Sequence, residues 1–116
     1  MTPTKVKNHL GESLGKVIDI VIDSQEECIA YAIISSGGFL GLGVKLIPVP
    51  WRALSLSSDG EWFVLRLDKA EFRSAPTLEA TARTQEELGN RDWSAFVHAF
   101  YGKDPYWKHG PLAARS

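Results

Sequence analysis

The sequence predicts a mainly β protein, a small sandwich or barrel of about six short strands with a C-terminal helical aromatic extension. The first two-thirds of the chain consists of short β-branched and apolar runs separated by turn residues, with no helical period before Asp68. Aromatic residues then recur at helical spacing between Trp93 and Tyr101. The length of 116 residues allows one domain of ordinary size and excludes a two-domain enzyme.

The run Val17–Asp23 alternates between two faces, as a strand does. We expect the face with Ile18, Ile20 and Ile22 to lie in the core and the face with Asp19 to be partly solvated. The next run, Cys28–Ile34, is apolar on both faces, which is typical of a central strand.

Two later segments carry turn and edge patterns. We expect the strand Val44–Val49 to lie at an edge of the sheet or to end at a bulge, because Pro48 and Pro50 have no amide N–H to donate. Residues 52–57 and 61–67 flank Ser58-Asp59-Gly60, and Asp-Gly favours the positive φ angles of a hairpin.

The barrel domain is predicted to span residues 1–76 and the extension residues 77–116. Asp68 can cap a short turn through Phe72 that Pro76 terminates. In the extension we expect one helix over about 92–101, with Asp92 as its N-cap and Gly102 as its terminator. The extension has no core of its own.

Composition narrows the choice of partners. The formal net charge is −1 and the sequence pI is about 6.3, so no global field attracts DNA. The one cysteine, Cys28, suits a reducing cytoplasm. The N-terminus lacks a secretory apolar core, and Ser35-Ser36-Gly37-Gly38 interrupts the uncharged stretch that begins at Cys28. We therefore expect a cytoplasmic protein without membrane insertion.

No residue pattern points to catalysis, a cofactor or a metal. Gly11–Gly15 matches G-x-S-x-G around Ser13, but a β-branched run follows where a nucleophile elbow needs a helix. Asp19 and Asp23 lie about 13 Å apart on a strand, too far to share a proton. His9, His98 and His109 have no ligand spacing, and His98 is expected on the polar side of the last helix.

The glycine-rich segment 37–43 was weighed as a nest of amide donors for phosphate. No helix follows it and no Gly-Lys-Ser or Gly-Lys-Thr closes it, so a hairpin connection is the favoured interpretation. Phe39 and Leu40 at its tip are candidates for a contact surface.

Half of the chain's aromatic residues lie in the last third of the chain. Together with the two loop residues they form a candidate interaction surface, which consists of Phe39, Leu40, Trp93, Phe96, Phe100, Tyr101, Tyr106 and Trp107. This cluster either packs on its own barrel or forms a contact between two copies, and we predict a homodimer. Stacking on single-stranded RNA is disfavoured, because few cations accompany the aromatic rings.

Several short motifs together resemble the PRC-barrel domain, named for the cytoplasmic domain of the photosynthetic reaction-centre H subunit. The likeness covers roughly residues 4–76, and the tail is similar to that of small stand-alone bacterial members. It rests on Gly11-Glu12-x-Leu14-Gly15-Lys16-Val17-x-Asp19, Tyr31-Ala32, Gly37-Gly38-Phe39-Leu40-Gly41-Leu42-Gly43, Pro48-Val49-Pro50-Trp51 and Ala75-Pro76.

The resemblance implies a small, mostly antiparallel barrel that acts as a protein-interaction or assembly module without enzymatic activity. The family also includes the C-terminal domain of a ribosome-maturation factor that binds a ribosomal protein, but no residue pattern here favours ribosomal association. A photosynthetic or membrane-associated electron-transfer accessory is a second expectation, and a small hydrolase using Ser13 is a disfavoured third. The partner protein stays unidentified.

Overall fold

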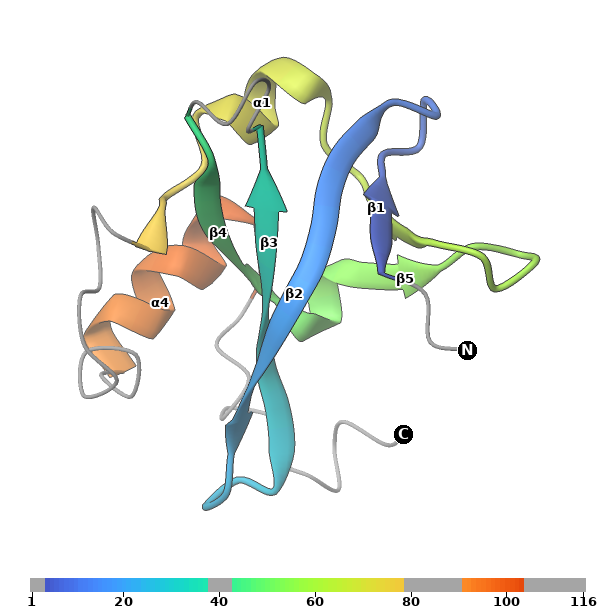
Figure 1. Cartoon of the computed structure of the whole chain (residues 1–116). Helices are drawn as coiled ribbons and strands as arrows, with labels where there is room; N and C mark the ends of the chain where they lie inside the picture. Colours follow the sequence, from blue (N-terminus) through green and yellow to red (C-terminus); the bar gives the residue numbers. More distant parts are fainter. Residues whose placement is uncertain (1–3, 38–42, 79–90, 104–116) are drawn as a thin grey trace.

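A computed structural model of the protein describes residues 4–37, 43–78 and 91–103, and these residues form one curled six-stranded sheet with helices beside it (Figure 1). The mainly β prediction is confirmed. The strands are β1 (Lys5–Lys7), β2 (Ser13–Asp23), β3 (Cys28–Ser36), β4 (Lys45–Pro50), β5 (Leu54–Leu56) and β6 (Phe63–Leu65). The helical elements are the 3-10 turn η2 (Trp51–Ala53) and the α-helices α1 (Lys69–Arg73) and α4 (Arg91–Phe100).

The sheet curls because its two edge strands are joined by a very short connection. The strand order is β4-β3-β2-β1-β6-β5, so β4 and β5 form opposite edges. Only η2 separates them along the chain, and three residues of 3-10 helix rise about 6 Å. The end of β4 and the start of β5 therefore lie close together, which bends the sheet into a half-barrel.

One pair of strands departs from the predicted antiparallel pattern. β1 pairs with β6 in parallel, through Val6 with Phe63 and Lys7 with Val64. β1 forms a hairpin with β2, and β6 forms a hairpin with β5. Where these two hairpins meet side by side, β1 and β6 run in the same direction, so the sheet is mixed.

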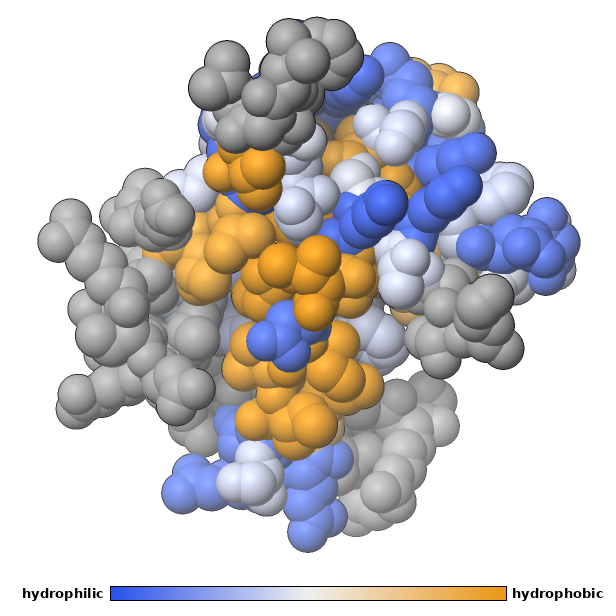
Figure 2. Space-filling view, viewed as in Figure 1, coloured by the Kyte–Doolittle hydropathy of each residue, from blue (hydrophilic) through white to orange (hydrophobic). Residues whose placement is uncertain are grey.

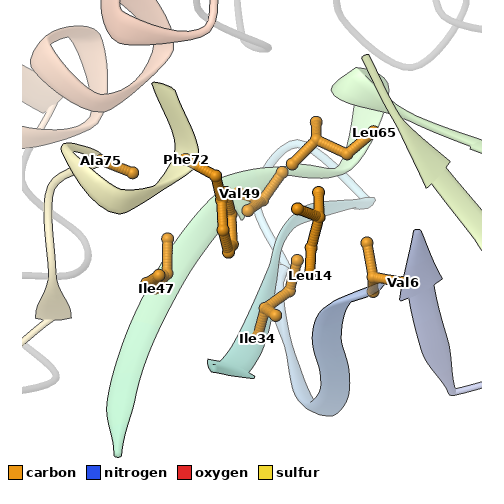
Figure 3. Close-up of a cluster of buried hydrophobic side chains, with 8 residues drawn as sticks. All are labelled: Val6, Leu14, Ile34, Ile47, Val49, Leu65, Phe72 and Ala75. Atoms are coloured by element: carbon orange, nitrogen blue, oxygen red, sulfur yellow. The ribbon is translucent and has the colours of Figure 1, made fainter. Parts of the chain in front are cut away.

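The inside of the curl is filled by apolar side chains that point toward one another (Figure 3). Val6, Ile34 and Val49 are fully buried. Phe72 of α1 is buried over the same cluster and closes it from one end. The complete cluster is Val6, Leu14, Ile34, Ile47, Val49, Leu65, Phe72 and Ala75.

The prediction that the isoleucines of β2 face the core is wrong. Ile18, Ile20 and Ile22 are 56%, 40% and 64% exposed, whereas Val17 and Val21 pack against buried clusters. Both faces of this run are apolar, so the alternation separates the faces without deciding which one the curl encloses. The pairing of β2 with β3 also shifts register just after Val17 and just after Val21, and such bulges are not visible in the sequence pattern.

The edge position of β4 is confirmed. Pro48 and Pro50 pair with Ile33 and Tyr31 of β3, and both prolines are buried. Helix α4 lies alongside β4 (Figure 1). An edge strand tolerates proline because its outward-facing amide positions have no ladder partner.

The predicted Asp-Gly hairpin joins β5 to β6. Ser57 Oγ donates to Asp59 Oδ1 at 2.7 Å, Glu61 N donates to the same oxygen at 3.0 Å, and Gly60 has φ 75°. These hydrogen bonds, from Ser57 first, lower the pKa of Asp59. The strands are shorter than predicted because this turn extends over residues 57–62.

The helix ends follow local capping rules, with one difference. Asp68 caps α1 in a capping box with Glu71, whose N–H donates to Asp68 Oδ1 at 2.7 Å. α4 begins at Arg91, so Asp92 lies in its first turn and is not its N-cap. Gly102 has φ 67° and terminates α4 as predicted, with Lys103 N donating to His98 O at 3.0 Å.

Gly15 is expected to be the glycine that tolerates a side chain least. It has φ 152°, and a Cβ built there would lie 2.3 Å from the backbone oxygen of Ser35. Gly60 also has positive φ, but a Cβ there meets nothing within 4 Å. We predict that Gly60→Ala costs about 1–2 kcal/mol from backbone strain and that Gly15→Ala costs about 2 kcal/mol more, because the clash is with backbone. Urea denaturation compares the two variants, and equal losses would contradict the close approach.

Candidate interaction surface

The exposed face of β2 is an apolar surface that no other described residue covers. It consists of Ile18, Ile20 and Ile22, and we call it the isoleucine face. Figure 2 shows apolar surface gathered where β2 and β3 cross the viewed side of the molecule. Single exposed apolar residues are ordinary, but several on one face of one strand are typical of a contact surface.

The isoleucine face lies on a well-ordered support. β2 pairs with β3 between Lys16 and Asp23, whereas β1 pairs with β2 only between Ser13 and Lys16. At the hairpin tip Asp23 Oδ1 accepts hydrogen bonds from Gln25 N at 2.9 Å and Glu26 N at 3.1 Å, as a turn cap does. The face therefore offers apolar side chains on a capped hairpin, and one edge of β2 beside them has no strand partner among the described residues.

The aromatic helix α4 packs on its own barrel through part of its surface. Trp93 is 9% exposed and meets Tyr31 of β3 edge-on, with ring centroids 5.3 Å apart. Val97 is fully buried in the same cluster. Phe100 and Tyr101 contact the core as well, with their rings 4.9 Å apart. Of the two alternatives left open by the sequence, packing on its own barrel holds for these side chains.

The predicted position of His98 is wrong. His98 is 2% exposed, and its ring lies 5.4 Å from that of Tyr31. The face of α4 that packs on the barrel contains the polar residues Ser94 and His98 beside Trp93 and Val97. The helix is therefore turned away from the orientation that would bury only its apolar residues. His98 Nδ1 donates to the backbone oxygen of Ser94 at 2.8 Å, which satisfies a polar atom inside the packing.

Phe96 is the aromatic residue of α4 that points away from the barrel, with 58% of its surface exposed. Four members of the predicted interaction surface, Phe39, Leu40, Tyr106 and Trp107, lie outside the described residues. The structure therefore brings Trp93, Phe100 and Tyr101 together inside and leaves Phe96 outside. A role for the eight residues in partner binding stays a prediction.

The residues weighed for chemistry occupy ordinary positions. Ser13 begins β2 as an exposed strand residue, between Gly11 with φ 83° and Gly15. Burial, followed by the carboxylates of Asp23 and Glu26, raises the pKa of the Cys28 thiol and disfavours a thiolate. Among the described residues, no three His, Cys, Asp or Glu side chains cluster as metal ligands would.

The isoleucine face was not predicted from the sequence as a contact surface. Apolar runs with polar residues interspersed are usually half-buried strands. The available signal was that both faces of Val17–Asp23 are apolar. The sequence does not show which of these side chains the fold leaves uncovered.

Two aromatic residues of α4 are expected to differ sharply in their effect on stability. Trp93→Ala should lower the free energy of unfolding by about 3 kcal/mol or more, because it leaves a cavity against Tyr31. Phe96→Ala should change the free energy of unfolding by less than about 0.5 kcal/mol, since the side chain is mostly solvated. Denaturant titration of each variant measures this, and similar losses would contradict the orientation of α4.

Stability should fall at acid pH through His98. Burial, with a smaller effect from Arg52, lowers the pKa of His98 below its ordinary value of 6.5, while the hydrogen bond to Ser94 raises it less. The unfolded chain therefore takes up this proton first as the pH falls, and folding is destabilised progressively below the unfolded pKa. Urea titrations at about pH 7.5 and about pH 5.5 test this.

His98→Asn is the matched variant, because asparagine donates a similar hydrogen bond but does not ionise in this range. Its loss of stability between the two pH values should be smaller than that of the wild type. An equal loss in both proteins would assign the acid sensitivity to other groups.

Comparison with known proteins gives one family and one similar protein. The PRC-barrel domain family matches residues 4–72. A stretch of 55 residues is 46% identical to part of an aspartate–tRNA(Asp/Asn) ligase from Corynebacterium efficiens, covering 47% of this chain and 9% of the ligase. The share of the ligase is too small for its activity to be transferred. No helix among the described residues is long and apolar enough to cross a membrane.

Proposed function

The chain belongs to the PRC-barrel domain family, and from this premise we propose that it is a non-enzymatic protein-interaction module that binds its partner through the isoleucine face. The observation that carries the proposal is the exposure of Ile18, Ile20 and Ile22 along β2. The described residues do not cover them, and burial of apolar surface is the main favourable term in protein association.

The isoleucine face offers apolar side chains, and the edge of β2 beside it is open among the described residues. Because β1 pairs with β2 only between Ser13 and Lys16, a partner that contacts the isoleucines can also pair with the backbone of this stretch. Because the β2–β3 hairpin is already ordered by Asp23, binding does not have to fix its backbone. A rigid apolar face of this kind suits a partner with an apolar surface of its own.

The test is a triple variant, Ile18→Thr, Ile20→Thr and Ile22→Thr. Threonine keeps the β-branched shape that strands favour and removes apolar area, so the fold should persist. We expect tagged wild-type protein to retain partner proteins that the triple variant retains at least about tenfold less, a loss of about 1.4 kcal/mol or more in binding free energy. Quantitative capture followed by mass spectrometry measures the ratio.

Leu56→Thr is the matched control, because Leu56 of β5 is 57% exposed and lies on another strand. It should retain the same partners as the wild type. Light scattering of the full chain tests a second copy as partner: a dimer that the triple variant loses would identify the homodimer. Partners and oligomeric state that are identical in all three proteins would contradict a role for the isoleucine face.

A further inference from the structure

A hollow of about 930 Å³ lies at the end of the curl that α1 closes, and its lining is strongly basic. Its residues come from β1, β2, β3, β4 and α1, which are far apart in the sequence. We call it the basic hollow. The cations that line it are Lys5, Lys7, Lys16, Lys45, Lys69 and Arg73, and its lining includes no acidic residue.

The basic hollow is an unusual concentration of charge for this chain. The whole sequence has 13 basic and 14 acidic residues, yet six of the basic ones line this single hollow. Lys7 lies over the ring of Trp62, with its Nζ 4.3 Å from the ring centroid, and its charge contributes to the lowered pKa of Asp59, which is not part of the lining. Like charges around one concave surface repel each other, and a bound anion relieves that repulsion.

Neutral hydrogen-bond donors lie among these cations. Ser13, Ser35 and Ser36 contribute hydroxyl groups to the lining. Gly37 and Gly43 line it too and lie close together, since a Cβ on Gly37 would be 2.9 Å from the oxygen of Gly43.

We propose that the basic hollow binds a small ligand that carries several phosphate groups, at a site separate from the isoleucine face. Five of the six cations are lysines, whose ammonium groups act as point charges and suit phosphate. The planar fork of Arg73 matches phosphate geometry too. The volume lies in the range of small-molecule sites. Inorganic polyphosphate and a nucleoside triphosphate present the same chemistry to these groups.

Calorimetric titration of the full chain with sodium tripolyphosphate tests the proposal. Binding is expected at low salt and should weaken as salt is added, because exposed charges are screened. The double variant Lys45→Glu and Lys69→Glu should weaken binding by about tenfold or more. Both side chains are exposed, so the fold should persist, and the melting temperature checks this.

The matched control is Arg66→Glu with Lys103→Glu, two exposed cations outside the hollow that give the same change in net charge. It should weaken binding by less than about twofold. Equal weakening by both double variants would overturn the proposal, because net charge alone would then explain it. If Lys45→Glu with Lys69→Glu fails to fold, Lys16→Gln replaces it, with Arg66→Gln as its control.

Three further titrants identify what the hollow recognises. ATP that binds as tightly as tripolyphosphate indicates recognition of the phosphate chain alone, and tighter ATP binding indicates a nucleotide; both outcomes support the proposal. A hexaglutamate peptide that binds as tightly as tripolyphosphate would overturn it in favour of carboxylates. A single-stranded RNA oligonucleotide that binds where tripolyphosphate does not would overturn it in favour of RNA, and no binding of any titrant at low salt would also refute it.

Discussion

The short connection between the two edge strands is the constraint on which the rest of this structure depends. η2 spans three residues between β4 and β5, so a sheet of six strands has to curl until its edges meet at that point. The curl gives the sheet an inside, where Val6, Ile34 and Leu65 meet although they are distant in the sequence. Val17 of β2 packs against this cluster, whereas Ile18, Ile20 and Ile22 of the same strand stay exposed.

Much of the local structure could be predicted because it depends on residues only a few positions apart. Asp68 and Glu71 cap each other across one helical turn, and Asp59 with Gly60 forms a turn whose hydrogen bonds stay within residues 57–62. Gly102 ends α4 because only glycine adopts its backbone angle without strain. In each case the residue type and its immediate neighbours determine the geometry.

Features that depend on contacts between distant residues could not be predicted from the local sequence. The parallel pairing of β1 with β6 follows from how two hairpins meet, and neither hairpin contains that information. The inner face of β2 depends on the curl, which is set some 30 residues further along the chain. The rotation of α4 depends on Tyr31 of β3, against which both Trp93 and His98 pack.

At the candidate sites too, local sequence predicted some features, whereas others depended on distant contacts. Aromatic spacing located the helix and its residues, but an exposed Phe96 and a buried His98 required knowledge of what the helix packs on. Net charge hid the basic hollow, because 14 acidic residues elsewhere balance its cations in the total. Charge matters to a ligand through its local arrangement, and only the fold reveals that arrangement.

A half-barrel with open edges is at risk of growing into a fibril, because an unpaired edge strand is a template for another strand. Pro48 and Pro50 remove two amide donors from β4, and α4 lies alongside the same strand. Templated addition of β-strands is disfavoured at this edge for both reasons. The prolines thus protect the protein against cross-β polymerisation while its outer faces remain available for ordered contacts.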